Sequence, residues 1–224
     1  MRPSRPAVAG FALSFALSGV LLAVYLFAGE ATYASLAAPD GAAFRVNGAI
    51  RVLDRTALLA VHRATLAYVL GEADRLPDAP GTSVPLFDPA ERSHLADVRD
   101  VFAGVRAVLV AALIALAWRL VRGLRAGPRH LARLARDGAI GAAVLVGAVG
   151  VLAAVAFEPL FMAFHLVFFP QGNFLFDPAT SNMLAVYPEP YWYGVTLRVG
   201  LAFVGLAAAV AAGGSVALRR LGDG

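Results

Sequence analysis

Four long apolar stretches divide the chain, at residues 8–29, 101–121, 139–157 and 195–216. Each has about twenty residues, which is the length that a helix needs to cross the ~30 Å hydrocarbon core of a bilayer. Hydrophobic residues make up 59% of the chain and the mean hydropathy is +0.71, outside the range of soluble globular proteins. We therefore expect an all-α integral membrane protein with four transmembrane helices, built as a single membrane domain over residues 1–224. The first stretch is longer than the apolar region of a signal peptide, so we expect it to stay as an anchor.

The arginines fix an expected orientation. They gather before the first stretch, between the second and third, and after the fourth, whereas the chain has no lysine. The positive-inside rule places these three regions in the cytoplasm and residues 30–100 and 158–193 outside. In a bacterial cell this is the cytoplasmic membrane, with both chain ends inside. The net charge of +4 thus reflects topology, and we expect no nucleic-acid partner.

The outer segment 30–100 is expected to be helical between its turns. Asp40-Gly41 and Asn47-Gly48 indicate turns, and residues 49–70 have apolar positions at helical spacing, with His62 expected at the polar edge of that helix. Residues 76–87 contain three prolines and indicate a loop. Asp88, Pro89 and Glu91 then give a helix start with a capping box, and nothing interrupts the helical pattern from there into the second span.

The segment between the third and fourth spans is rich in aromatic residues. It reads FHLVFFPQGNFLFDPATSNMLAVYP over residues 164–188, too apolar for a free loop and too rich in proline to continue a helix. We expect this aromatic segment to lie in the outer interface of the membrane.

Two histidines are expected at similar depth in that interface. His94 lies seven residues before the second span, about 10 Å above it at 1.5 Å per residue. His165 lies at a similar height if the third helix continues beyond residue 157. Asp97 is one turn after His94 and could orient its imidazole. Phe161, Phe164 and Phe168 are placed to surround His165.

Each histidine also has a plainer interpretation, as a tolerated amphipathic side chain at the interface. Two histidines at matched depth favour a functional site, because ionisable groups close to the membrane interior are usually functional. His130 lies among cytoplasmic arginines and is expected to be solvated. Arg106 and Arg198 lie near the outer ends of spans two and four, where they could snorkel, pair with Glu158 or hold an anionic group. Gly205, Ala209 and Gly213 form a small-residue ridge expected to pack against another helix.

These motifs resemble those of a known family. The segments SHLADVRDVF at 93–102, FHLVFFPQGNFLFDP at 164–178 and YPEPYW at 187–192 are similar to the lipoprotein intramolecular transacylases. In this chain Leu95 stands where the family leads us to expect Met, and Ser181-Asn182 stands where it leads us to expect Asp-Pro. The resemblance covers nearly the whole chain.

The resemblance implies an acyl transfer. The family moves the sn-2 acyl chain of a diacylglyceryl-modified lipoprotein onto the amine of its own N-terminal cysteine, giving a lyso-form lipoprotein. The family's histidines carry over onto His94 and His165, one as base and one as acid, with His165 the favoured base because aromatic surroundings disfavour an imidazolium. Asp97, Arg106, Glu158, Phe161, Phe168, Asp177 and Arg198 are candidates for binding or orienting the substrate. We expect no cofactor, no metal and a monomer acting on lipoproteins and membrane lipid.

Other functions fit the same residues. An intermolecular acyltransferase could use both histidines with a second lipid as donor. A metal-dependent lipid hydrolase could bind its metal through His94, Asp97 and His165, although the chain has no HExxH motif and no cysteine. A non-catalytic membrane subunit would need neither histidine, and a transporter is least favoured because no charged residue lies in mid-span.

Overall fold

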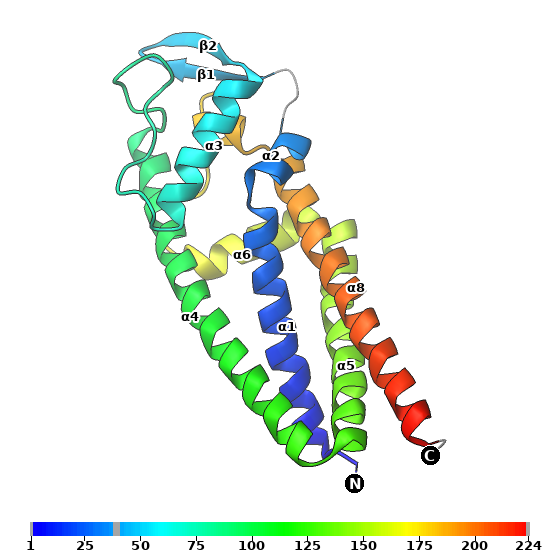
Figure 1. Ribbon diagram of the computed structural model, residues 1–224. Helices are drawn as coiled ribbons and strands as arrows, with labels where there is room; N and C mark the ends of the chain where they lie inside the picture. The colour runs from blue at the N-terminus through cyan, green and yellow to red at the C-terminus, as the bar shows by residue number, and fades with distance from the viewer. Residues whose placement is uncertain (1, 38–40, 223–224) are drawn as a thin grey trace. The chain divides into compact units, whose positions relative to one another are not determined.

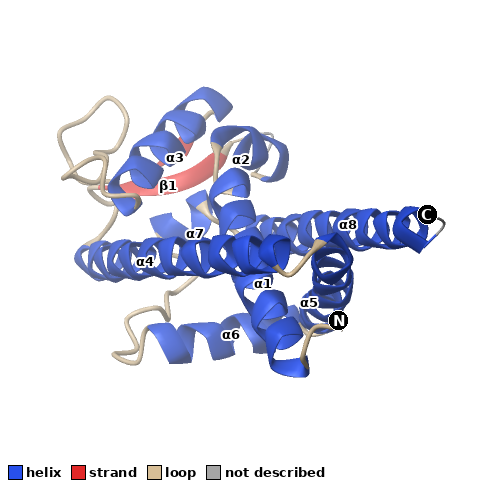
Figure 2. Ribbon diagram, turned by 60° about the horizontal axis from the view of Figure 1, so that its bottom comes forward, coloured by secondary structure: helices blue, strands red, loops and turns tan. Residues whose placement is uncertain are grey.

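The computed structural model describes residues 2–37 and 41–222, and these form two compact units. Unit 1 comprises Met1–Tyr25, Arg106–Val155 and Leu197–Gly224, and unit 2 comprises Leu26–Val105 and Ala156–Thr196. Helices dominate both, with one short pair of strands (Figures 1 and 2). In chain order the elements are α1 (Arg5–Phe27), α2 (Glu30–Leu36), β1 (Ala42–Val46), β2 (Ala49–Leu53), α3 (Arg55–Val69), α4 (Pro89–Arg125), α5 (Pro128–Val155), α6 (Phe157–Phe168), α7 (Asn182–Val186) and α8 (Glu189–Gly222).

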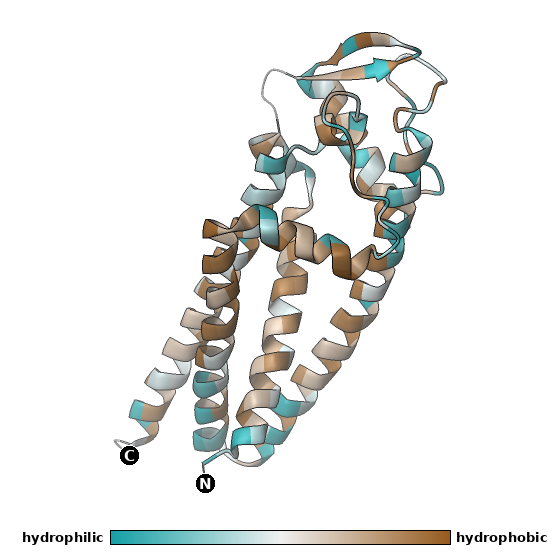
Figure 3. Cartoon of the chain, turned by 180° about the vertical axis from the view of Figure 1, so that it is seen from behind, coloured by the Kyte–Doolittle hydropathy of each residue, from teal (hydrophilic) through white to brown (hydrophobic). Residues whose placement is uncertain are grey.

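The four expected spans are four long helices, α1, α4, α5 and α8. Each is long and apolar enough to cross a membrane. Figure 3 shows their apolar residues, with hydrophilic residues at the arginine-bearing ends of α4 and α5. The fold class predicted from the sequence is therefore confirmed.

Unit 1 is held together by small residues that let helices approach closely. Its core contains Phe11 and Phe15 of α1, Ala139 of α5 and Phe203 of α8. A Cβ atom on Gly138 would overlap the Phe11 ring, so α1 and α5 can meet only because this position is glycine. The small-residue ridge of Gly205, Ala209 and Gly213 was expected to pack against another helix, and this prediction was wrong. A Cβ atom added at Gly205 or Gly213 would meet open space, and Ala209 is exposed.

Unit 2 has its own core, built from residues far apart in sequence. Buried members come from α2, the two strands, α3, the loop before α4, and the segment 186–191. Tyr33 lies at its centre, and its hydroxyl donates to the Val186 carbonyl at 2.7 Å. Burial raises the pKa of the Tyr33 hydroxyl above its usual value, so it stays a hydrogen-bond donor.

The helix expected over residues 49–70 is shorter, and it follows a hairpin. Strands β1 and β2 pair antiparallel, with Val46 opposite Ala49. Asn47 and Gly48 both have positive φ, 50° and 77°, which is the backbone of a two-residue hairpin turn. The Asn47-Gly48 turn was predicted correctly, but the residues after it continue as a strand. Helix α3 begins only after Asp54, whose side chain accepts from the Ala57 amide at 2.7 Å. Asp40, in the other expected turn, lies outside the described residues.

The third apolar helix also ends earlier than expected. Ala156 interrupts it with φ −142° and ψ 51°, and α6 begins as a new helix at Phe157. Pro159 accounts for the break, because in a continuous helix its ring would clash with the carbonyl of Val155. The assumption that a continuing helix carries His165 was therefore wrong, and His165 lies on α6.

Candidate functional site

The structure brings His94 and His165 together within unit 2. His94 lies near the start of α4, before its apolar stretch, and His165 lies on α6. Their ring centroids are 5.9 Å apart and the rings are inclined by 20°. Two imidazoles from elements seventy residues apart thus lie side by side, as a paired acid–base centre requires.

His94 is almost fully enclosed, with only 5% of its surface exposed. The rings of Phe169 and Phe176 lie against it, with centroids 4.6 and 5.7 Å away. Burial, and secondly the neighbouring His165, lower the pKa of His94 to about 4, against a smaller opposing effect of Asn173 and Asp97. His94 is therefore a neutral imidazole at neutral pH. Its Nδ1 atom is buried and has no hydrogen-bond partner within the described residues.

The tautomer of His165 follows from its hydrogen bond. Its Nδ1 lies 2.8 Å from the carbonyl oxygen of Phe161, one helical turn before it. A carbonyl oxygen can only accept, so Nδ1 carries the hydrogen and Nε2 keeps a free lone pair. Burial lowers the pKa of His165, while the bond to Phe161 acts in the opposite direction. The result is a neutral imidazole with Nε2 available as a base.

Aromatic rings surround His165, which is half-buried. Phe161 and Phe164 of α6 have centroids 4.2 and 5.5 Å from its ring, and Phe169 and Phe174 of the following loop lie at 5.4 and 5.1 Å. Phe168 was expected in this set, but its ring pairs with Phe164 at 4.6 Å and is half exposed. Apolar surroundings of this kind suit an acyl chain and disfavour a charged imidazolium.

Asp97 was expected to orient His94 directly, but its hydrogen bonds go elsewhere. The Asp97 carboxylate accepts from the side-chain amides of Gln171, at 2.7 Å, and Asn173. Asn173 also donates to the Ser93 hydroxyl at 3.3 Å. Asp97 therefore fastens the loop after α6 to the first turns of α4, and that loop carries Phe169 and Phe174 against the two histidines.

Glu91 is a buried carboxylate whose long-range role the sequence did not reveal. Only 1% of its surface is exposed. Besides the expected capping bond from the Asp88 amide at 2.9 Å, it accepts from the Ser181 hydroxyl at 2.6 Å and the Met183 amide at 2.8 Å. Glu91 thus joins the start of α4, one turn before His94, to the start of α7.

Ser181 and Asn182, where the chain departs from the family pattern, both have structural partners. Ser181 caps α7 by accepting from the Leu184 amide at 3.1 Å. The Asn182 side chain exchanges hydrogen bonds with the backbone of Arg45, at 2.7 and 2.8 Å, and donates to the Leu86 carbonyl at 2.6 Å. The amides of Gln171, Asn173 and Asn182 were missed because polar residues scattered through an aromatic segment show no periodicity.

The other candidates take different places. The Asp177 side chain accepts from the Ala179 amide at 2.9 Å and closes a turn on an exposed part of the loop. Glu158 lies exposed in the first turn of α6. Arg106 and Arg198 belong to unit 1, whereas both histidines belong to unit 2. Their expected roles toward the substrate stay predictions.

His62 was expected at the polar edge of its helix, and this prediction was wrong: the residue is part of the core of unit 2. Only 2% of its surface is exposed, and it stacks on Tyr33 with a centroid distance of 4.1 Å. Its Nε2 donates to the Ala28 carbonyl at 3.0 Å, which leaves Nδ1 to accept from the Tyr187 hydroxyl at 3.3 Å. Burial lowers its pKa to about 4. Both ring nitrogens of His62 thus have a hydrogen-bond partner, whereas Nδ1 of His94 has none among the described residues.

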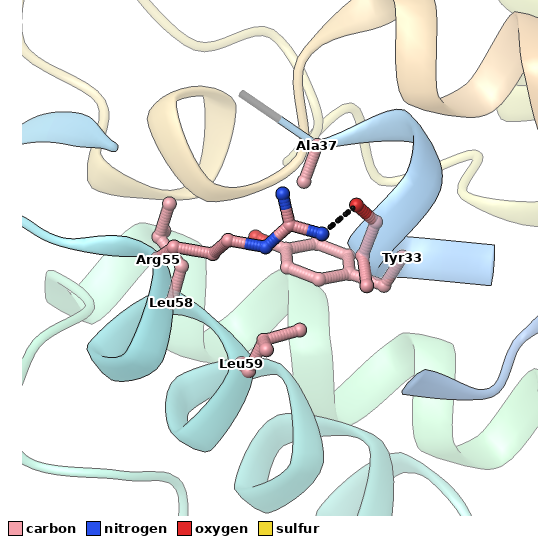
Figure 4. Close-up of a pocket in the computed structure, with 6 residues that line it drawn as sticks. Tyr33, Ala37, Arg55, Leu58 and Leu59 are labelled. Carbon is pink, nitrogen blue, oxygen red and sulfur yellow. Dashed lines mark hydrogen bonds between the residues drawn. The ribbon is translucent and has the colours of Figure 1, made fainter. Parts of the chain in front are cut away.

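A small cavity beside Tyr33 is too narrow for lipid. It is lined by Ala37, Arg55, Leu58 and Leu59, and Arg55 closes one side by donating to the Ala34 carbonyl at 2.9 Å (Figure 4). Its volume of about 10 Å³ is room for a single water molecule. We find no group of three or more histidine, aspartate or glutamate side chains able to hold a metal within residues 2–37 and 41–222.

Solved structures of a bacterial protein share this fold. The membrane integral lipoprotein intramolecular transacylase Lit from Bacillus cereus matches with a TM-score of 0.74 and 15% identity, covering 98% of each chain. Two of its variants, with a histidine replaced by arginine or by alanine, match with TM-scores of 0.66 and 0.67 at 14% identity. The match to the arginine variant covers 96% of this chain and 92% of that one. The match to the alanine variant covers 98% of this chain and 96% of that one. The shared fold defines the class, a membrane-integral helical protein.

The sequence itself gives the family. The profile of the family described as lipoprotein intramolecular transacylase Lit matches residues 9–192. The chain therefore belongs to the Lit family, as its motifs suggested, and it is an acyltransferase. No curated protein matches the chain in a direct sequence comparison.

Proposed function

We propose that this protein transfers the sn-2 acyl chain of a diacylglyceryl-modified lipoprotein to the amine of the lipoprotein's N-terminal cysteine. The observation that carries the proposal is the pairing of His94 and His165 at 5.9 Å, with Nε2 of His165 left free by the bond from Nδ1 to Phe161. The attacking amine belongs to the substrate, so no serine or cysteine nucleophile is needed.

The reaction balances with these two side chains alone. The cysteine amine attacks the ester carbonyl, and Nε2 of His165 takes the amine proton. An N–H of His94 donates to the oxyanion of the tetrahedral intermediate. The bond from the carbonyl carbon to the glycerol oxygen then breaks, and the His165 imidazolium returns its proton to that oxygen. One ester and one amine become one amide and one alcohol.

The surroundings favour this chemistry over hydrolysis. Both imidazoles are kept neutral by burial, and a neutral imidazole is the form that can accept the amine proton. The aromatic rings around His165 limit access of water and match an acyl chain. Because amine and ester belong to one molecule, holding them close supplies much of the rate increase. We place the reaction at the outer face of the cytoplasmic membrane and expect the protein to act as a monomer.

Lipoproteins from cells test the proposal. Mass spectrometry of their N-terminal peptides, with and without this chain, should show lyso-form peptides with an amide-linked acyl chain only when the chain is present. Cells carrying an inactive protein, with both His94 and His165 replaced by Ala, are the matched control. Lyso-form peptides at equal levels in all three strains would overturn the proposal.

A further inference from the structure

Unit 1 contains a cavity that the acyl-transfer reaction does not use. Its volume is about 610 Å³, within the usual size of ligand pockets. Four arginines line it: Arg2, Arg129, Arg133 and Arg136. The remaining lining residues are Pro3, Asp137 and two residues near the end of α8. All of them belong to unit 1, so the cavity is formed by this unit alone.

Among the described residues, the charges around the cavity are poorly balanced. Arg136 is paired with Asp137, with Nε 2.7 Å from the Asp137 oxygen. Arg129 donates to the backbone carbonyl of Leu221, which holds its side chain in place without neutralising it. Within the part of the chain that the structure describes, no carboxylate forms an ion pair with Arg2, Arg129 or Arg133. Three like charges that share a cavity repel one another, so an anion between them would relieve that repulsion.

The geometry suits a phosphate. Arg129, Arg133 and Arg136 follow one another at i+4 and i+3 in the first turns of α5, so they project from one face of the helix. The guanidinium fork can bind two phosphate oxygens at once, which a lysine ammonium cannot. Pro128 begins α5, and the helix dipole adds partial positive charge at the same end. The arginines and the helix start thus act together on one anion.

The position along the helices favours a lipid as the source of the phosphate. The arginines occupy residues 129–136, and α5 is apolar from Ala139 onward. The cavity therefore lies at the depth where phospholipid headgroups meet the hydrocarbon core. Acyl chains could run along the exposed apolar side of α5, where Val144, Val151 and Val155 are each more than 60% exposed. We propose that this arginine-lined cavity is a binding site for the phosphate headgroup of an anionic phospholipid.

Lipid retention by the purified protein tests the site. Native mass spectrometry in zwitterionic detergent would count the phosphatidylglycerol molecules kept by the wild type, R133Q, R2Q and R125Q. Arg125 is the matched control, because it is an exposed arginine at the end of α4 in the same unit but does not line the cavity. We expect R133Q and R2Q each to lower phosphatidylglycerol affinity about fivefold, with R125Q near wild type. R2Q lies before α1, so it keeps the test valid if R133Q fails to fold.

Two further arms identify the ligand. Phosphatidylcholine, which has no net charge, should be retained no better by wild type than by R133Q. Inorganic phosphate at millimolar concentration should not displace phosphatidylglycerol if the acyl chains contribute, and full displacement would refute the lipid source. Equal loss of affinity in R133Q and R125Q would show attraction to arginines in general and would overturn the site.

Discussion

At the scale of single residues, the two histidines differ in how their ring nitrogens are used. Nδ1 of His165 is committed to the Phe161 carbonyl, while Nδ1 of His94 is buried without a partner among the described residues. A histidine that serves only structure would have both nitrogens occupied, as His62 has. In our proposal, this difference leaves ring nitrogens of the pair for the substrate.

Replacing either histidine should remove activity without removing the protein. We expect His94→Ala and His165→Ala each to lower the rate of acyl transfer by about 10²–10⁴, the usual contribution of a general acid or base. Membrane accumulation should change little. His130→Ala, a change in a half-exposed residue of α5, is the control and should keep most of the activity. Full activity of His165→Ala would refute its role as base.

The pKa of His94 should depend on its neighbour. Burial and then His165 lower it to about 4, so removing the imidazole in His165→Gln should raise the pKa of His94, though burial should keep it below 6.5. As pH falls, His94 should stay neutral through pH 6.5 and gain its proton only near pH 4. NMR titration of histidine-labelled protein in detergent measures both values. A wild-type pKa of 6.5 would show that the ring is open to water.

At the scale of elements, the buried Glu91 holds two helix starts together. Three donors point at its carboxylate: the Asp88 amide, the Ser181 hydroxyl and the Met183 amide. A carboxylate can accept from all three, whereas a glutamine must turn an NH₂ group toward one of them. The start of α4, which carries His94, therefore depends on a residue that never touches the substrate in our proposal.

Glu91→Gln should be costly for that reason. We expect a loss of about 3 kcal/mol in the free energy of unfolding, because a buried hydrogen bond to a charged group is lost and one donor is left unsatisfied. Thermal unfolding in detergent measures this, with Glu72→Gln on the exposed surface as control. A melting temperature equal to that of Glu72→Gln would show that the contacts of Glu91 contribute nothing.

Local patterns in the sequence were enough to predict most elements. The lengths of the apolar stretches predicted the four spans, and the sequence Asp88-Pro89-Ala90-Glu91 predicted the start of α4. The errors came from tertiary contacts. The strand β2 and the burial of His62 depend on packing against Tyr33 and its neighbours, which no local period encodes. The remaining partners of Glu91 and those of Asp97 lie more than seventy residues away in the sequence, so these hydrogen bonds could not be predicted either.

At the scale of the whole molecule, the proposed reaction requires unit 2 to face away from the cytoplasm. Single cysteines at positions 60 and 175, both exposed, should react with a membrane-impermeant reagent added to intact cells. A cysteine at position 128, the first residue of α5, should react only after the membrane is opened, because arginine-rich segments stay inside. Labelling at position 128 in intact cells would reverse the orientation.

The reaction itself is tested most directly by the mass of its product. An intramolecular shift conserves acyl groups, since two esters and a free amine become one ester, one amide and one hydroxyl. We therefore expect purified protein, given one diacylglyceryl lipopeptide as its only lipid, to leave the peptide mass unchanged while fragmentation finds one acyl chain on the cysteine nitrogen. The His94→Ala and His165→Ala proteins should leave the fragmentation unchanged as well. A gain of one acyl chain would indicate a second lipid donor, a loss with released fatty acid would indicate hydrolysis, and either result would contradict the intramolecular transfer.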